Sequence, residues 1–311
     1  MSEREIVCGE LGVAIDDLRN QGYRLDLIYP ADDPHTATLS KQSDRVRVTR
    51  RPDAPAPSDL LPSFTPEFVL TPGGAHPAQG RAGMLYRDLV PGRLGGRYIA
   101  SHISIPEGGP VADWVHFHKI RLQMIYVRRG WVRVVYEDQG EPFVMHEGDL
   151  VLQPPEIRHQ VLESSPGLEV IEIGSPAVHA TFAEHRFKLP NGRDPRRTFA
   201  GQRFLHHVGA QTPWTLFNGW QAQETAINEA TGGLAEVRTI RPVETVSMAF
   251  QPHVGELVFA FVLEGSATLE FRGSRKIGTE DAFVVPPDEP WVLSNASSDL
   301  RLFHVTTARL D

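Results

Sequence analysis

Short apolar runs separated by glycine and proline dominate two parts of the chain. The first part extends from about Met84 to Gly174 and includes "LQMIYV", "WVRVVYE", "GDLVLQP" and "LEVIEIG". The second extends from about Glu236 to Leu310 and includes "ELVFAFVLEG", "ATLEFRG", "DAFVVPP" and "LRLFHVT". Apolar runs of this length, bounded by turn residues and repeated at close spacing, are typical of the short strands of β-sandwiches and barrels. The pattern therefore predicts an all-β protein.

The N-terminal part has a different pattern. It predicts a short helix around Ile15–Asn20 and two short strands, Tyr23–Tyr29 and Arg45–Arg50, which alternate apolar and polar residues. Such strands need a sheet to complete, so we expect them to pack onto a barrel or onto a partner subunit. The following segment, "RPDAPAPSDLLPSFTP", is rich in proline and polar residues and indicates a linker or a surface loop.

A second loop-like segment, "FKLPNGRDPRRTFAGQRF", separates the two β-rich parts. The two breaks predict three regions. Residues 1–65 form an N-terminal extension of mixed helix and strands with the Pro-rich linker. Residues 66–186 form a first β unit, and residues 187–311 form a linker and a second β unit.

The two β-rich parts are copies of one unit. When "HFHKIRLQMIYVRRGWVRVVYE" is set above "QPHVGELVFAFVLEGSATLEFR", Gly130 aligns with Gly265 without a gap. The later segments "GDLVLQPPEIRHQVL" and "EDAFVVPPDEPWVLS" align as well, with their Pro-Pro pairs in register. Self-similarity of this kind indicates that one β unit is used twice.

Composition and charge exclude several classes of protein. The formal net charge is −8 over 311 residues and no long basic stripe is present, which argues against nucleic-acid binding. Cys8 is the only cysteine, so an internal disulfide is impossible and a reducing compartment is expected. The first residues lack the apolar stretch of a signal peptide, and the longest apolar run, Leu257–Leu263, is too short to span a bilayer. We therefore expect a cytoplasmic protein without a membrane segment.

Candidate chemistry is concentrated in the first copy. His116 and His118 are two residues apart, so on a strand both side chains leave the same face. Gln123 joins that face if the chain bends around Lys119–Arg121, and His159 follows the Pro-Pro turn on a strand that could pair beside the first. Three imidazoles and one further donor can hold a divalent ion and leave positions open for a substrate.

These residues resemble the two motifs of the cupin superfamily. Motif one corresponds to Gly109, His116, His118, Gln123 and Gly130, and motif two to Gly148, Pro154 and His159. The resemblance covers both copies and implies two cupin-type β-barrels, or jelly rolls, in one chain. It also implies a metal held by the three histidines and Gln123, and a homodimer. Gln123 stands where the family usually has glutamate, which leaves the ligand count and the identity of the metal open.

The second copy predicts a degenerate site. At the positions equivalent to His116, His118, Gln123 and His159 it has Gln251, His253, Val258 and Trp291. Valine cannot coordinate a metal, whereas the amide oxygen of Gln123 in the first copy can. A neutral glutamine also leaves the first site about one charge unit more positive than the usual three-His, one-Glu set, which favours an anionic, bidentate substrate.

Iron(II) is the first choice of metal, because His-rich sites with open positions suit oxygen chemistry; manganese, nickel and zinc stay open. Two residues close in sequence to the predicted ligands are candidate substrate contacts. Trp114 could line the pocket, although such a tryptophan is more often core, and Arg121 could bind a carboxylate, although an exposed loop arginine is the simpler interpretation.

Four functions fit the sequence. The first is a dioxygenase that acts on a small anionic, aromatic or keto/hydroxy acid. The others are a metal-dependent isomerase or lyase, a non-catalytic small-molecule-binding cupin, and a structural protein in which the histidines are a relic. The fold alone selects none of them.

Overall fold

The computed structural model describes residues 3–53, 60–74, 77–79, 84–243 and 247–310. Part of the Pro-rich segment, residues 54–59, and the first residues of "ETVSMAF", residues 244–246, lie outside the described residues. Strands make up most of the regular structure, which confirms the prediction of an all-β protein. None of the helices in the described ranges is long and apolar enough to cross a membrane.

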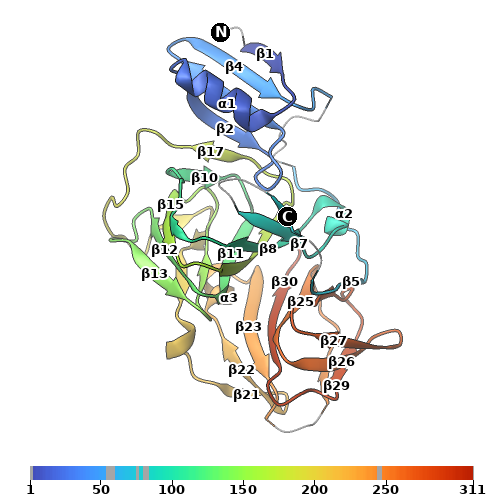
Figure 1. Ribbon diagram of the computed structural model, residues 1–311. Helices are drawn as coiled ribbons and strands as arrows, with labels where there is room; N and C mark the ends of the chain where they lie inside the picture. Colours follow the sequence, from blue (N-terminus) through green and yellow to red (C-terminus); the bar gives the residue numbers. More distant parts are fainter. Residues whose placement is uncertain (1–2, 54–59, 75–76, 80–83, 244–246, 311) are drawn as a thin grey trace.

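The N-terminal extension is a small helix-and-sheet module at one end of the molecule (Figure 1). Its elements are β1 (Glu3–Val7), α1 (Leu11–Asn20), β2 (Arg24–Tyr29), β3 (Thr36–Lys41) and β4 (Asp44–Thr49). The buried side chains of Leu11 and Leu18 on α1 pack in one cluster with those of the strands behind it, such as Leu39 and Val46. β2 pairs with β17 (Thr181–Ala183), a strand of the first β unit. The expected packing onto a barrel is therefore confirmed within the chain, while β1 and β3 were not predicted.

The first unit consists of two facing sheets. One sheet has the order β1-β4-β3-β2-β17-β10-β15-β12-β13, with β9 paired to β15, and the other has the order β20-β14-β11-β16-β8-β7-β6. The strands not yet bounded are β6 (Ala78–Gln79), β7 (Leu85–Asp88), β8 (Ile99–Ile105), β9 (Gly109–Pro110), β10 (His116–His118), β11 (Leu122–Arg129), β12 (Trp131–Tyr136), β13 (Phe143–His146), β14 (Leu150–Leu152), β15 (His159–Ser164), β16 (Leu168–Ser175) and β20 (Leu205–His207); the short helix α2 (Arg93–Gly96) precedes β8.

The second unit repeats the arrangement with a seven-stranded and a four-stranded sheet. Their orders are β21-β22-β23-β30-β25-β28-β5 and β24-β29-β26-β27. The strands are β5 (Val69–Thr71), β21 (Thr215–Phe217), β22 (Trp220–Glu224), β23 (Ala235–Arg241), β24 (Met248–Phe250), β25 (Val258–Glu264), β26 (Ser266–Glu270), β27 (Ser274–Gly278), β28 (Ala282–Val284), β29 (Trp291–Ser294) and β30 (Arg301–Thr307). The remaining elements are the small ladder β18 (Thr198–Phe199) and β19 (Gln202–Arg203), the 3-10 turn η2 (Gly209–Gln211) and the helix α3 (Ile227–Ala230).

The aligned glycines of the repeat make the same turn. Gly130 joins β11 to β12 with a φ of 79°, and Gly265 joins β25 to β26 with a φ of 74°. A Cβ atom would lie 2.3 Å from the Ser165 hydroxyl oxygen at the first position and 2.5 Å from that of Ser297 at the second. Only glycine tolerates both the left-handed backbone and the close neighbour, so the alignment of the two copies has a structural cause.

Each unit contains one strand that comes from the chain segment assigned to the other unit. β5 lies in the segment assigned to the first unit, yet it pairs with β28 of the second. β20 lies in the segment assigned to the second unit, yet it pairs with β14 of the first. The domain boundaries after residues 65 and 186 stay a prediction, and the sheets cross both of them.

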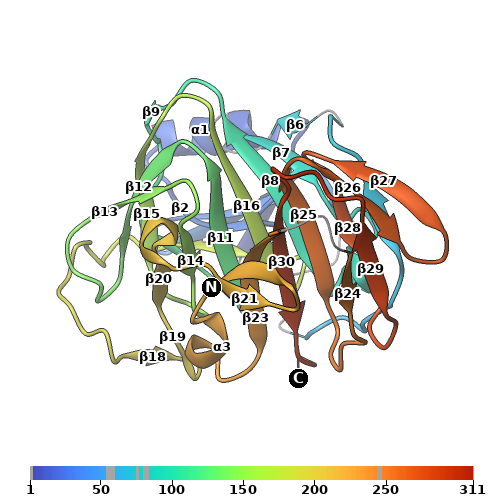
Figure 2. The same cartoon turned by 90° about the horizontal axis from the view of Figure 1, so that it is seen from below.

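A large apolar core lies between the two units, whose sheets stand side by side in Figure 2. Its side chains from β11 are Leu122, Met124 and Tyr126, and they pack in the same cluster as Phe259 and Phe303 of the second unit. Because successive residues of a strand face opposite sides, the residues between them on β11 point away from this interface and into the first unit. This alternation determines the orientation of Gln123.

Candidate metal centre

Three buried imidazoles meet inside the first unit. His116 and His118 lie on β10, and His116 is directly opposite His159, the first residue of β15. The centroid of the His116 ring is 4.2 Å from that of His159 and 5.1 Å from that of His118. The three side chains offer ligand atoms that all lie within 4.8 Å of one another. Two ligands about 2.1 Å from one ion can be at most about 4.2 Å apart, so a small inward movement of the rings is enough to bind a metal.

The surroundings fix the orientation of each ring. The Nδ1 atom of His116 lies 2.7 Å from the Trp114 carbonyl oxygen, and Nδ1 of His159 lies 3.0 Å from the Ile157 carbonyl oxygen. Nδ1 of His118 lies 3.1 Å from the Thr181 hydroxyl oxygen. A carbonyl can only accept, so the first two Nδ1 atoms carry a proton and Nε2 is the ring nitrogen that could bind a metal. Histidine ligands of metals are usually held in this way through the other ring nitrogen.

The carboxylate of Asp113 lies close to the Nδ1 atom of His116. The Asp113 Oδ1 atom lies 3.4 Å from His116 Nδ1, and its Oδ2 atom accepts a 2.9 Å hydrogen bond from the Val161 amide. A carboxylate near the distal nitrogen of a histidine makes the ring a stronger metal ligand. Asp113 was not among the residues predicted from the sequence.

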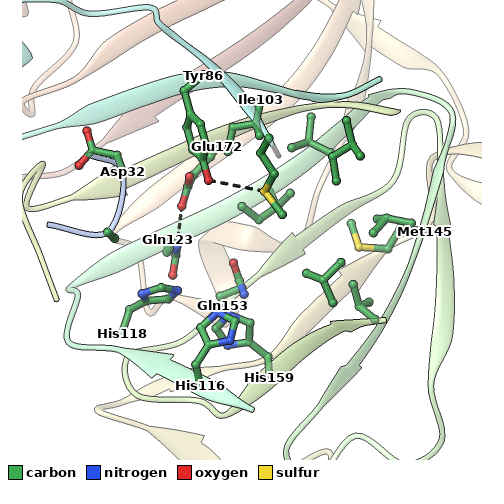
Figure 3. Close-up of a pocket in the computed structure, with 18 of the residues that line it drawn as sticks. Asp32, Tyr86, Ile103, His116, His118, Gln123, Met145, Gln153, His159 and Glu172 are labelled. Atoms are coloured by element: carbon green, nitrogen blue, oxygen red, sulfur yellow. Dashed lines mark hydrogen bonds between the residues drawn. The ribbon is translucent and has the colours of Figure 1, made fainter. Parts of the chain in front are cut away.

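Gln123 approaches the histidines from the opposite sheet. Residues 119–121 belong to no strand, and they separate β10 in one sheet from β11 in the other, which is the bend that the sequence interpretation required. The Gln123 side chain is buried and lines the same cavity as the three imidazoles. Its Nε2 atom donates a 2.6 Å hydrogen bond to Oε1 of Glu172 on β16. The Gln123 side chain thus lies between this carboxylate and the histidines (Figure 3).

The cavity around these groups is small and mostly apolar, with a volume of about 110 Å³. Apolar side chains form much of the wall, and they include Ile103, Ile105, Ile125, Val132, Val134, Met145 and Val170. Tyr136 stacks on His159 at a ring-centroid distance of 5.5 Å, and burial raises the pKa of its phenol far above the usual value, so the group stays protonated.

Several residues that line the cavity were missed by the sequence interpretation. Glu172 has a sequence signal, because it is a charged residue within the apolar run "LEVIEIG". His179 contacts the His118 ring edge-on at 5.3 Å. Ala31 and Asp32 come from the N-terminal extension, for which no site residue was predicted. Nothing in the local sequence points to these two, since only the pairing of β2 with β17 brings them there.

The two candidate substrate contacts lie outside the cavity lining. Trp114 is half-buried and lines a neighbouring groove between α1 and the first unit, and Arg121 is exposed. Trp114 supports the site through its carbonyl, which accepts from His116. A substrate-binding role for either side chain stays a prediction.

The electrostatic argument drawn from Gln123 needs correction. The sequence implied a site one charge unit more positive than a three-His, one-Glu set. The structure places the side chain of Glu172 next to the Gln123 amide, so the cavity contains a carboxyl group that the sequence interpretation did not count. The two residues come together because Gln123 is paired with Gly174, which has no side chain, and Glu172 is its diagonal neighbour on the same face.

The second unit has lost the corresponding donors. His116 pairs with His159 in the first unit, and in the second Phe250 pairs with Trp291. Phe250, rather than the aligned Gln251, therefore stands in the place of His116. The aligned His253 is held elsewhere, because its Nε2 atom lies 2.7 Å from the Thr307 carbonyl oxygen. Within the described residues, the three-histidine cluster of the first unit is the arrangement suited to a metal.

Comparisons with known proteins agree with this architecture. No protein-family model and no curated protein sequence matches the chain. Among solved structures, salicylate 1,2-dioxygenase from Pseudaminobacter salicylatoxidans is 17% identical, with a TM-score of 0.59 over 80% of this chain and 86% of its own. The protein Ylba from E. coli is 11% identical, with a TM-score of 0.57 over 79% of this chain and 93% of its own.

A variant of oxalate decarboxylase from B. subtilis is 13% identical, with a TM-score of 0.56 over 81% of this chain and 79% of its own. At such identities the likeness establishes the fold alone, and it extends over both β units. This chain therefore has the fold of the cupin superfamily, with two cupin units in succession.

Proposed function

We propose that this protein is a metal-dependent dioxygenase that uses iron(II) in the first cupin unit and acts on a small hydroxy or keto acid, aromatic or aliphatic. The observation that carries the proposal is the set of three buried imidazoles whose Nδ1 atoms are held by neighbouring oxygens, at one end of an apolar cavity. The likeness in fold to salicylate 1,2-dioxygenase supports the choice of reaction.

The residues present fit a divalent ion. His116, His118 and His159 would hold it through Nε2, with the Gln123 amide oxygen as a neutral fourth donor. Iron(II) held by such a set, with positions left open, would bind and activate dioxygen, while the electrons would come from oxidation of the bound acid. The protein contributes ligands that burial holds in place, 1% to 6% exposed, and an apolar wall that excludes water from the reaction.

The cavity restricts the class of substrate. Among its described lining residues there is no lysine or arginine, so the carboxylate of an acid would have to bind at the metal itself. A hydroxyl or keto oxygen beside that carboxylate makes the ligand bidentate. The remainder of the molecule would pack against the isoleucine and valine wall, which suits a ring or a short aliphatic chain.

A lyase is the second candidate, favoured by the likeness in fold to oxalate decarboxylase. It differs from the dioxygenase in a measurable way, because decarboxylation releases carbon dioxide without net oxygen uptake. A non-catalytic small-molecule-binding cupin would bind the acid and leave it unchanged.

One experiment separates these functions. The protein is purified without chelators, its metal is quantified, and the iron-loaded protein is screened with salicylate, gentisate, 2-hydroxy acids, 2-keto acids and oxalate. Oxygen uptake with ring cleavage or oxidised product supports the dioxygenase. Carbon dioxide release without oxygen uptake would replace it by a lyase, and saturable binding without turnover would replace it by a binding protein.

The homodimer expected from the resemblance also stays a proposal. Light scattering at micromolar concentration checks it, and a mass of one chain would contradict it.

A further inference from the structure

Glu172 is a carboxylate inside the metal cavity that belongs to neither cupin motif. It lies on β16, faces the first unit together with Val170, and lines the cavity with the three histidines. Its Oε1 atom accepts the 2.6 Å hydrogen bond from Gln123 Nε2. Figure 3 shows this bond on the side of Gln123 that is turned away from His118.

This hydrogen bond determines which end of the amide faces the histidines. A carboxylate only accepts hydrogen bonds, so the NH₂ group of Gln123 must face Glu172. The amide oxygen is then directed to the opposite side, toward the imidazoles (Figure 3). In the reversed orientation, two oxygen acceptors would face each other and the NH₂ group, which cannot bind a cation, would face the metal position.

We propose that Glu172 is the displaced carboxylate of this metal centre: it holds the Gln123 oxygen toward the metal and supplies the negative charge that the neutral ligands lack. The inference rests on the proposed function, since it requires that the first unit binds a metal. Glu172 acts through Gln123 and is a positioning residue.

The second unit supports a joint role for the two residues. Ile125 pairs with Glu172 five residues before Gly130, and Ala260 pairs with His304 five residues before Gly265. His304 thus stands in the place of Glu172, and Val258 in the place of Gln123. The unit that has lost the imidazole pair has lost the amide and the carboxylate as well.

The test compares metal affinities of the folded protein. Co(II) and Fe(II) are titrated anaerobically, in competition with a chelator, into the chelated wild type, Glu172→Gln and the exchange variant Gln123→Glu/Glu172→Gln. Glu163→Gln is the matched control, because Glu163 is a partly exposed carboxylate on β15, in the facing sheet of the same unit. Circular dichroism and the midpoint of thermal unfolding establish that each variant is folded.

Glu172→Gln should weaken metal binding about 10- to 100-fold, the usual effect of losing a group that supports a metal ligand. Its Co(II) absorption spectrum should change, because an amide at position 172 can present either its oxygen or its NH₂ group to Gln123 and no longer fixes which end of the Gln123 amide faces the ion. The exchange variant returns one carboxylate and one amide to the pair, so its affinity should recover, while Glu163→Gln should match the wild type.

Wild-type affinity and spectrum in Glu172→Gln would overturn the inference, and so would a folded exchange variant that stays as weak as Glu172→Gln. Equal weakening by Glu163→Gln would overturn it too, since the effect would then belong to any lost carboxylate. Absence of metal binding in the wild type would overturn the proposed function, and the inference with it. Metal binding without turnover of any acid would overturn the proposed reaction alone.

Discussion

Phe250 and Trp291 stack face to face in the second unit, with ring centroids 3.6 Å apart and planes 3° from parallel. The register of the strands gives this pair the place that His116 and His159 hold in the first unit. Two imidazoles at this position can share a metal, whereas two aromatic rings can only pack. The same backbone therefore serves a polar centre in one unit and an apolar core in the other.

The metal should depend on the first unit alone. His116→Ala and His159→Ala should each lose most of the bound metal, because each removes one of few ligands from a site with open positions. Metal analysis of the purified variants measures the loss. His253→Ala is the control, since the ring of His253 is bonded to the Thr307 carbonyl oxygen and should leave the metal content unchanged. Loss of metal in that variant would contradict the assignment of the two units.

The aromatic pair should contribute to stability and not to metal binding. Trp291→Ala removes a fully buried indole, which is 2% exposed, and should lower the free energy of unfolding by about 3–5 kcal/mol. Denaturant unfolding followed by tryptophan fluorescence and circular dichroism measures the change. A variant that kept wild-type stability but lost metal would show that Trp291 is linked to the site instead.

The two units should be coupled by a buried ion pair. Arg97 before β8 donates to Glu256 of the second unit from Nε at 2.9 Å and from Nη2 at 2.7 Å, and both side chains are 9% exposed. Glu256→Gln leaves the guanidinium buried without its counter-charge and should cost about 3–5 kcal/mol in the free energy of unfolding.

Chemical denaturation of Glu256→Gln beside Glu289→Gln tests this coupling. Glu289 also binds Arg272 through two hydrogen bonds, at 3.1 Å and 2.6 Å, but the pair is exposed to solvent. Its loss should change stability by less than about 1 kcal/mol. Equal effects of the two substitutions would contradict the role of burial.

Acid should destabilise the protein through His304. Burial, reinforced by the positive charge of Arg238 and by His253, lowers the pKa of this imidazole to about 3. In the described part of the chain, neither ring nitrogen has a hydrogen-bond partner. The unfolded chain takes up a proton below pH 6.5, while the folded protein resists it down to about pH 3. The contribution of neutral His304 to the free energy of unfolding is therefore fully present above pH 6.5. It is lost progressively as the pH decreases toward the pKa of His304 in the folded protein.

At pH 4.5, two pH units below the ordinary value, the loss from His304 amounts to about 2.7 kcal/mol. Denaturant unfolding between pH 7.5 and 4 measures this loss. The free energy of unfolding of His304→Phe should decrease less steeply with falling pH than that of the wild type. His102 adds to the dependence in both proteins, because burial and the charges of Arg87 and Arg128 lower its pKa to about 4. Identical slopes would mean that His304 is protonated without cost in the folded state.

The local sequence determined most of the strands of this protein and the three histidines that could hold a metal. Strand periodicity and turn residues are properties of neighbouring positions, so "LQMIYV" and "LEVIEIG" predicted β11 and β16 directly. The repeat predicted two equivalent units, and the spacing of His116 and His118 predicted a shared face. Each of these inferences needs only the alternation of side chains along one strand.

The tertiary structure decided which distant residues meet. The register of β11 against β16 sets Gly174 opposite Gln123, and this absent side chain brings Glu172 to the amide. The pairing of β2 with β17 brings Ala31 into the cavity wall. Strand register and the exchange of edge strands depend on packing between segments far apart in the sequence, so no local pattern specifies them. Most strands and the three histidines could therefore be predicted from the sequence, whereas the position of the Glu172 carboxylate beside Gln123 depends on the fold.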